Sequence, residues 1–344
     1  MQSTKINLLG KTLSELEQVV IGLNLPSYIA KQIAHWLYNK QVTEIDQMTN
    51  LSKVVRETLN KGFQVGCSEP VKVQVSVDGT KKYLFKATNG FIEAAFIPEK
   101  DRATLCVSSQ VGCKMACQYC MTGKQGFQGH LLAGDIINQV RSIPERDNLT
   151  NIVFMGMGEP FDNLDEVLNS LDIMTGSYGF AWAPKRITVS SIGVIPGMKR
   201  FLDETRCHLA ISLNSPFDEE RALLMPVQKK YPIKDVINEI TRFHFGQQRR
   251  VSFEYIMFKG LNDTEKHVNE LVRLLQGIDC RINLIRFHPV PGVTLVGSDD
   301  FTIEQFQQKL KKKGITTTLR QSRGMDIAAA CGLLSTKEAG IDNN

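Results

Sequence analysis

The sequence lacks any hydrophobic run that approaches the roughly 20 apolar residues of a membrane-spanning helix. Its first residues, MQSTKINLLGKTLSELEQ, also lack the basic, apolar and small-residue succession of a signal peptide. We therefore expect a cytoplasmic protein that has no membrane partner. In that reducing compartment, the eight cysteines are expected to serve metal or redox chemistry in preference to a disulfide scaffold.

The sequence also lacks a strong charge of either sign. Its formal net charge is +5, from 41 Lys and Arg against 36 Asp and Glu. Basic pairs such as Lys185–Arg186 and Arg249–Arg250 are compatible with a polyanionic partner such as RNA, although most such pairs lie on solvated faces. The 344 residues, 42% of them hydrophobic, are enough for one barrel-sized domain and a smaller one.

A run of three cysteines lacks the fourth ligand that a structural zinc site or an ordinary ferredoxin cluster needs. Cys113, Cys117 and Cys120 have C-x3-C-x2-C spacing within GCKMACQYCMTG. Thiolates this close in sequence can bind one soft metal centre and leave one coordination position open. The alternative interpretation is a zinc knuckle.

The chain divides into four segments. Residues 1–66 are expected to form a helical accessory domain, and residues 67–100 a β meander that links it to the core. Residues 101–334 are expected to form that core, and residues 335–344 a flexible tail.

The first segment contains three helical patterns. Thr12 and Glu15 have capping-box spacing at the first helix, Pro26 ends it, and Asn50 is the predicted cap of the third. The three helices are expected to serve either as a packing unit or as an RNA-docking domain, and the sequence favours neither.

From residue 101 onward, apolar strand patterns alternate with amphipathic helix patterns. Repeated βα units predict a parallel sheet with right-handed crossovers. About six units are too few to close an eight-stranded barrel, so the predicted fold class is α/β, a partial (βα)6 barrel. The predicted strands are Thr104–Ser108, Asn151–Met155, Arg186–Ser190, His208–Leu213, Val251–Phe258, Arg281–Phe287 and Thr316–Leu319.

Four motifs fall at the carboxyl ends of the first four strands, where chemistry gathers in such folds. The cysteine run comes first, and MGMGEP, SSIG and SLNSP follow. Glycines let the backbone approach a ligand closely, and the Glu159 carboxylate can accept hydrogen bonds from an ammonium or a ribose. Taken alone, the glycine-rich motif is better explained as an ordinary βα turn, and Ser190 and the stretch Ser212–Asn214 could be helix caps or turn formers.

Three further residues are ambiguous when each is taken alone. Glu93, in FIEAAFI, lies either on a solvated strand face or in a dry site with a raised pKa, where it could act as a base. A free cysteine most often packs as a small, buried, apolar side chain, and this is the simplest interpretation of Cys106 and of Cys331 when each is taken alone.

The cysteine spacing, with Tyr119 before the last cysteine, resembles the radical S-adenosylmethionine (SAM) superfamily. That resemblance implies a [4Fe–4S] cluster on the three cysteines and SAM on the fourth iron, as the source of a 5′-deoxyadenosyl radical. RATLCVSSQVGC, MGMGEP, INLIRFHPVPG and RGMDIAAACG together resemble the RlmN/Cfr family of radical SAM adenosine C-methyltransferases, over about residues 8–334. Pro160 places the chain nearer to the RlmN branch.

The resemblance assigns the SAM site residue by residue. Asn214 stands where family members often carry histidine, and His288 where they often carry asparagine, but both side chains still form hydrogen bonds. The residues expected to line the SAM site are Gly158, Glu159, Ser190, Ser212, Leu213, Asn214 and His288.

The resemblance also implies catalytic roles for Cys331, Cys106 and Glu93. Cys331 matches a cysteine that one SAM methylates; a radical from a second SAM removes hydrogen from the S-methyl group, and the methylene radical adds to the adenine. Cys106 matches the residue that resolves this covalent protein–RNA intermediate, which leaves a Cys106–Cys331 disulfide. Glu93 matches the proton acceptor, and the sequence leaves open whether it or Cys106 removes the C2 proton.

By the same resemblance, the enzyme is expected to methylate C2 of an adenosine in the peptidyl-transferase region of 23S rRNA and of adenosine 37 in tRNA. Its expected partners are these RNAs and an electron donor such as flavodoxin or ferredoxin, and it is expected to be a monomer. The alternatives are Cfr-like methylation at C8 of the same rRNA adenosine and a non-catalytic zinc-binding RNA module.

Overall fold

The computed structural model describes residues 5–243, 245 and 251–336. The helices in this part of the chain are α1 (Leu13–Gly22), α2 (Tyr28–Ala34), α3 (Lys53–Gly62), α4 (Met121–Gln125), α5 (Ala133–Arg141), α6 (Leu164–Thr175), α7 (Ile195–Glu204), α8 (Asp218–Leu224), α9 (Ile233–Arg242), α10 (Glu265–Leu274) and α11 (Asp300–Lys312). The strands are β1 (Ile6–Asn7), β2 (Phe63–Gln64), β3 (Lys72–Val75), β4 (Lys81–Ala87), β5 (Gly90–Glu99), β6 (Arg102–Cys106), β7 (Gln110–Val111), β8 (Gly129–His130), β9 (Asn151–Phe154), β10 (Ile187–Ser191), β11 (His208–Ser212), β12 (Val251–Met257), β13 (Cys280–Arg286) and β14 (Thr316–Leu319).

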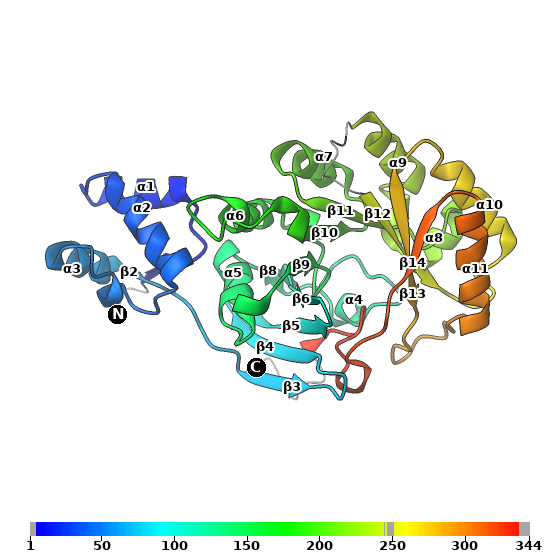
Figure 1. Ribbon diagram of the computed structural model, residues 1–344, viewed down its shortest axis with the longest axis horizontal. Helices are drawn as coiled ribbons and strands as arrows, with labels where there is room; N and C mark the ends of the chain where they lie inside the picture. The colour runs from blue at the N-terminus through cyan, green and yellow to red at the C-terminus, as the bar shows by residue number, and fades with distance from the viewer. Residues whose placement is uncertain (1–4, 244, 246–250, 337–344) are drawn as a thin grey trace.

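A ten-stranded sheet organises the molecule, in the order β14-β13-β12-β11-β10-β9-β6-β5-β4-β3. From β6 to β14 all neighbouring strands are parallel, and helices link each to the next, as βα units require. All seven predicted core strands occur within two residues of their predicted bounds. The predicted α/β partial barrel is confirmed, with the helical domain at one end of the molecule (Figure 1).

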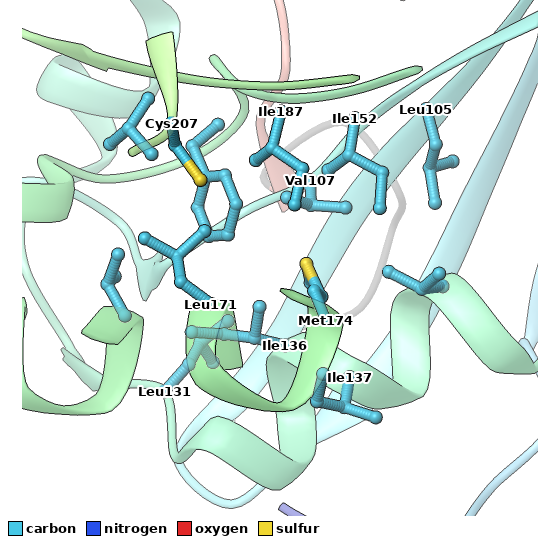
Figure 2. Packing of buried hydrophobic residues seen from close by; sticks show 14 of the residues in the cluster. Leu105, Val107, Leu131, Ile136, Ile137, Ile152, Leu171, Met174, Ile187 and Cys207 are labelled. Carbon is cyan, nitrogen blue, oxygen red and sulfur yellow. The ribbon is translucent and has the colours of Figure 1, made fainter. Parts of the chain in front are cut away.

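Alternate strand residues face the helices that cover the barrel. Leu105, Ile152 and Ile187, from three neighbouring strands, point toward Ile136 of α5 and Met174 of α6 (Figure 2). All five side chains are fully buried, and burial of a side chain of this size stabilises the fold by about 1.5–3 kcal/mol. The residues between them on the strands face the lumen instead.

The structure confirms the predicted cap of the first N-terminal helix and places the cap of the third at a different residue. The backbone N–H of Thr12 donates to the Glu15 carboxylate at 2.7 Å, and its hydroxyl accepts from the Glu15 N–H at 3.3 Å, which confirms the capping box. The prediction of Asn50 as the third cap is wrong, because Ser52 caps α3 with its side-chain oxygen. Asn50 instead accepts a hydrogen bond from the indole of Trp36.

The helical domain docks on α5 and on the loop after α6. Tyr38 packs edge-on against Phe180, and the Asn39 amide donates to the carbonyl of Gly179 at 2.8 Å. From α5, the buried Arg141 guanidinium donates to two carbonyls of the helical domain at 2.7 and 3.0 Å. These polar contacts fix the orientation of the domain on the barrel.

The β meander adds antiparallel strands to one edge of the barrel sheet. Val71, Val73 and Val75 are 58%, 47% and 60% exposed. The last two lie on β3, which pairs only with β4 and forms the free edge of the sheet. The buried residues of the meander therefore lie mainly on β4 and β5.

After β14 the chain crosses back to the meander, as the red segment in Figure 1 shows. Asp326 accepts a hydrogen bond from the Ser76 hydroxyl at 2.5 Å. Ser335 and Thr336, which were expected in a flexible tail, are buried because both form hydrogen bonds with α4. The rest of that expected tail, residues 337–344, lies outside the described residues. Within the described chain, the helices are all too short or too polar to cross a membrane.

Candidate active site

A cavity of about 1680 Å³ opens at the carboxyl ends of the parallel strands and continues into the barrel lumen. Polar residues such as Thr188, Ser252, Asn283 and Thr318 line it, whereas branched apolar side chains fill closed barrels. The volume exceeds the roughly 300–1,000 Å³ of a typical small-molecule pocket. The cavity therefore has room for a cofactor and for a substrate group beside it.

The cysteine run forms the loop between β7 and α4 at this cavity. Cys113, Cys117 and Cys120 all contribute to the cavity wall. Gly112 has φ of +72°, and a Cβ there would lie 1.7 Å from the carbonyl oxygen of Gly126. The loop can close in this way only because the residue before Cys113 is glycine.

The cluster thiols lie in largely dry surroundings. Burial raises the pKa of Cys113 to about 12 and that of Cys117 farther, and the neighbouring sulfurs raise both again. Such thiols ionise only beside a positive centre, as metal-bound thiols do. Across the described residues, no three His, Cys, Asp or Glu side chains converge on a single ion.

The MGMGEP turn presents a buried carboxylate to the cavity. Gly158 has φ of +101°, and a Cβ there would lie 2.6 Å from the Cβ of Gln110. Glu159 is 3% exposed and accepts hydrogen bonds from the backbone N–H of Phe161 at 3.1 Å and of Ile192 at 3.0 Å. Burial raises the pKa of Glu159 to about 7. The carboxylate thus ties the turn after β9 to the turn after β10.

Asn214 connects the cluster loop to two barrel strands. Its side-chain N–H donates to the hydroxyl of Tyr119 at 2.8 Å, and its side-chain oxygen accepts from the Ile256 N–H at 2.9 Å. Asn214 has φ of +57°, a conformation that asparagine tolerates better than most residues. Asn214, one of the two residues that depart from the family pattern, is therefore hydrogen-bonded to the cluster loop and to β12.

The other residues expected at the SAM site fall into two groups. Ser190, Ser212 and His288 line the cavity, and burial lowers the pKa of His288. The side chain of Leu213 is fully buried in the hydrophobic core, so only its backbone can contribute to the site. Ser191, which the sequence analysis did not select, also lines the cavity and is hydrogen-bonded to the Glu159 carboxylate.

Sequence analysis also missed Arg221, which connects two turns of the site. Its side chain is fully buried and donates to the carbonyls of Ile192 at 2.7 Å, Ser212 at 3.1 Å and Leu213 at 3.1 Å. The guanidinium thus joins the turns after β10 and β11. No local signal marks it, because an arginine in the helical segment DEERALL is typical of an exposed helix.

Cys106 and Cys331 lie within electrostatic range of each other at the cavity, although one ends β6 and the other lies in the C-terminal segment. Both are free thiols, Cys106 buried and Cys331 exposed. Burial, followed by the proximity of Cys331, raises the pKa of Cys106 to about 12. The Gly332 carbonyl accepts from the Met121 N–H at 2.8 Å, which holds this segment against the cluster loop.

Glu93 lies in a dry site on β5, with 3% of its surface exposed, so the solvated-face interpretation is wrong. Its carboxylate pairs with the Lys82 ammonium at 3.0 Å and accepts from the Ser335 N–H at 2.9 Å. The described residues that line the cavity do not include Glu93. In this structure its carboxylate anchors the segment that carries Cys331.

A partial parallel barrel with three cysteines in the loop before α4 and a glycine-rich turn after the next parallel strand defines a radical SAM enzyme. Residues 107–275 match the family model of the Radical SAM superfamily. Residues 6–65 match a second model, described as the ribosomal RNA large subunit methyltransferase N-terminal domain.

Similar proteins narrow the class of radical SAM enzymes to one family. The chain is 56% identical over 341 residues to the probable dual-specificity RNA methyltransferase RlmN of Bacteroides thetaiotaomicron, with 99% of each chain covered. It is 40% identical to the dual-specificity RNA methyltransferase RlmN of Geobacter sulfurreducens, with 97% of this chain and 93% of the relative covered. A crystal structure of a radical SAM methyltransferase from Sphaerobacter thermophilus matches with a TM-score of 0.89 at 38% identity, over 96% of this chain and 99% of that one. The chain therefore belongs to the RlmN family of dual-specificity RNA methyltransferases.

A radical SAM methyltransferase of this family uses a [4Fe–4S] cluster and SAM. The residues of this chain fit both groups. Three thiols that need a positive centre line one wall of the cavity, and Glu159 with Ser190 lies on strand ends of the same cavity. Gly158 lines the same cavity, and its turn requires glycine because a Cβ there would collide with Gln110.

Proposed function

We propose that this enzyme methylates C2 of an adenosine in the peptidyl-transferase region of 23S rRNA and of adenosine 37 in tRNA, with Cys331 as the methyl carrier. The pairing of Cys106 with Cys331 at the cavity wall, beside the cluster loop, is the observation that supports this proposal most. Direct methyl transfer from SAM to RNA needs no pair of thiols, whereas a covalent protein–RNA intermediate needs one to carry carbon and one to resolve it.

The target carbon explains why such a route is needed. C2 of adenine is an sp² carbon with little nucleophilic character, so its direct attack on the SAM methyl group is slow. Cys331 instead accepts a methyl group by displacement: its sulfur–carbon bond forms as the carbon–sulfonium bond breaks, and S-adenosylhomocysteine leaves. When bound, the cluster and a second SAM supply the radical chemistry that removes hydrogen from this S-methyl group. Its carbon then bonds to C2 of the adenine.

Resolution of the intermediate falls to Cys106. The Cys106 thiol loses its proton, and a sulfur–sulfur bond forms between Cys106 and Cys331 as the bond between Cys331 and the RNA carbon breaks. The electron pair of the broken bond stays on that carbon, which takes up a proton to become the methyl group, and an external dithiol then reduces the disulfide. The C2 proton goes either to Cys106 or to Glu93. Cys106 lines the cavity but is held as a thiol by burial. Glu93 is paired with Lys82, so it reaches the base only if the C-terminal segment moves.

The cavity and the charge of the molecule are compatible with an RNA substrate. A cavity of about 1680 Å³ accommodates a nucleotide beside SAM, and the target base leaves its stack at a cost of a few kcal/mol. A net charge of +5 favours a polyanionic partner. The proposal includes a monomeric, cytoplasmic enzyme and an electron donor such as flavodoxin or ferredoxin.

Nucleoside mass spectrometry tests the proposal directly. Anaerobically purified protein, incubated with SAM, a reductant and either RNA, is expected to produce 2-methyladenosine. The Cys331→Ala variant is expected to lose at least 100-fold in product while it keeps about four irons. 8-Methyladenosine as product would favour the Cfr-like alternative. A zinc-containing, colourless and inactive protein would favour the non-catalytic RNA module, and full activity of the variant would exclude Cys331 as carrier.

Removal of Cys106 separates the two halves of the reaction. The Cys106→Ala variant keeps the methyl carrier but lacks the thiol that resolves the intermediate. We expect a protein–RNA crosslink at Cys331 to accumulate under turnover conditions, detected by a shift on a denaturing gel and by peptide mass spectrometry. A matched Cys280→Ala variant is expected to release product without a crosslink. Product release at the wild-type rate from Cys106→Ala would assign resolution to another residue.

A further inference from the structure

Arg320 immediately follows β14 and lines the cavity at the thiol pair. Its guanidinium is hydrogen-bonded to Cys331 and lies within electrostatic range of Cys106. The Glu254 carboxylate lies 3.5 Å from Nε of Arg320, and the sulfur of Met155 lies 3.1 Å from its Nη1. None of the roles assigned above uses this cation.

The position of the guanidinium is fixed from behind. Glu254, on β12, is 5% exposed, and its other carboxylate oxygen accepts from the Asn283 amide at 2.7 Å and the Ser252 hydroxyl at 3.2 Å. The backbone N–H of Arg320 also donates to the carbonyl of Leu284 at 2.9 Å. Glu254 is therefore oriented by side chains of β12 and of its neighbour β13, and it in turn orients Arg320. About a third of the Arg320 side chain stays exposed, toward the cavity.

The two thiols at this cation differ in their surroundings. Cys106 is buried in an apolar cluster with Ala95, Val153 and Ala329, and it stays protonated at neutral pH. Cys331 is exposed at the cavity and carries the hydrogen bond from Arg320. A guanidinium stabilises a thiolate that it contacts, because a charge-assisted hydrogen bond is stronger than a neutral one.

We propose that Arg320 is a further catalytic residue, which stabilises the thiolate of Cys331 for its reaction with the methyl group, and that Glu254 is its positioning residue. The identity of the electrophile as the SAM methyl group rests on the proposed function. In the step itself, the thiol proton leaves to solvent and the sulfur lone pair forms the bond to carbon. The carbon–sulfonium bond breaks, its electron pair stays on S-adenosylhomocysteine, and nothing is oxidised or reduced.

The size of the effect follows from two opposing terms. The strength of a charge-assisted hydrogen bond corresponds to about 10-fold to 100-fold in an equilibrium constant. A more stable thiolate is also a weaker nucleophile, with a Brønsted coefficient of about 0.4–0.5. About half of the logarithmic gain therefore reaches the rate, so loss of Arg320 is expected to slow Cys331 roughly 3-fold to 10-fold.

The test compares holoenzyme of the wild type, Arg320→Ala and Arg320→Lys, with Arg281→Gln as a matched control from the far end of the same lumen. Peptide mass spectrometry follows two rates at Cys331: alkylation by iodoacetamide, and transfer of an isotope-labelled methyl group from SAM. Arg320→Ala is expected to be roughly 3-fold to 10-fold slower in both, and dilute guanidinium ion is expected to restore part of its rate. Arg320→Lys is expected to keep most of the wild-type rate, and Arg281→Gln all of it.

Each outcome separates this inference from the proposed function. Wild-type alkylation rates in Arg320→Ala would overturn the role of Arg320 and leave Cys331 as methyl carrier. A slow variant that neither lysine nor guanidinium ion restores would show that its charge is not the cause, and would overturn the role as well. Slow alkylation of Arg320→Ala, together with no methyl group on Cys331 even in the wild type, would overturn the proposed function and support the role of Arg320.

Discussion

At the scale of single residues, burial sets which groups of the site are charged. Cys106 and Cys331 share one wall of the cavity, yet only Cys106 is buried, so the two sulfurs have different chemistry available. Glu159 is a second case, because its carboxylate is almost completely removed from water and is only partly compensated by backbone N–H groups. The free-energy cost of burying the charged carboxylate makes the stability of the protein depend on pH.

Glu159 is predicted to make the ligand-free protein less stable as pH rises. Burial raises its pKa to about 7, against 4.5 for the unperturbed group. Between these pH values the folded state binds more protons than the unfolded state, so the free energy of unfolding falls with rising pH, by up to about 3 kcal/mol. Urea unfolding of cluster-free protein between pH 5.5 and pH 8 is expected to show this slope in the wild type and not in Glu159→Gln.

The matched control is Glu145→Gln. Burial opposes its ionisation, but hydrogen bonds from Lys81 and Tyr83 outweigh burial and lower the pKa of Glu145. Its contribution to stability is therefore complete above pH 4.5 and is lost only in more acidic solution. Glu145→Gln is expected to lower stability at every pH in the tested range without a change in slope. Equal slopes in the wild type and in Glu159→Gln would contradict the assignment.

Residue types and spacing were enough to select the cysteines that line the cavity. They were not enough to select the two arginines of the site, Arg221 and Arg320. Cys113, Cys117 and Cys120 lie within one short loop, so sequence distance limits their separation in space. The partners of Arg221 and Arg320 come from other strands, and only the fold brings them together. An isolated arginine carries no local pattern, which is why sequence analysis selected neither.

At the scale of secondary structure elements, the parallel strands were predictable because apolar strand patterns alternate with amphipathic helix patterns over the whole core. One detail failed for a physical reason. Ser52, not Asn50, caps α3, because Ser52 lies one residue before the helix and its side-chain oxygen accepts a hydrogen bond from the helix backbone. The exposure of the valines on β3 was not predictable, because periodicity indicates a strand but not whether anything covers its faces.

Arg221 is predicted to hold the ends of β10 and β11 in register for the cofactor. Arg221→Met keeps the length of the side chain but leaves the buried carbonyls of Ile192, Ser212 and Leu213 without this donor. The Leu213 carbonyl still accepts from the Ser215 N–H at 2.7 Å, whereas those of Ile192 and Ser212 lose the Arg221 donor. We expect a loss of about 2 kcal/mol or more in the free energy of unfolding, because each unsatisfied buried acceptor costs about 1–3 kcal/mol. Urea unfolding measures the loss, and SAM binding is expected to weaken in parallel.

The control for this change is Arg242→Met on α9. The Arg242 side chain is 73% exposed and pairs with Glu239 at 2.9 Å. Exposed pairs contribute at most about 1 kcal/mol, so this variant is expected to stay within that range and to bind SAM normally. A loss at Arg221→Met no larger than at Arg242→Met would remove the bracing role.

At the scale of the whole molecule, segments distant in sequence close the site. The C-terminal segment returns to β5 and α4, and it holds Cys331 beside the first parallel strand. The helical domain is different, because the described residues that line the cavity all come from residue 97 onward. It is docked by buried contacts such as Arg141, yet it builds no part of the cavity wall. Its two interpretations, a packing unit and an RNA-docking domain, therefore differ in the effect that they predict for its surface charge.

Neutralising the helical domain is accordingly predicted to weaken RNA binding and leave the chemistry at Cys331 unchanged. Lys31, Lys40 and Lys61 are exposed there, and their joint change to glutamine lowers the net charge from +5 to +2. Each lost phosphate contact reduces the slope of log affinity against log salt by about 0.7–0.9, so tRNA binding is expected to lose about 2 in slope. The matched control changes the exposed run Lys311–Lys313 at the end of α11, on the opposite side of the molecule in Figure 1, and also gives +2. Equal slopes for the two variants would mean that net charge alone acts, and that the helical domain is only a packing unit.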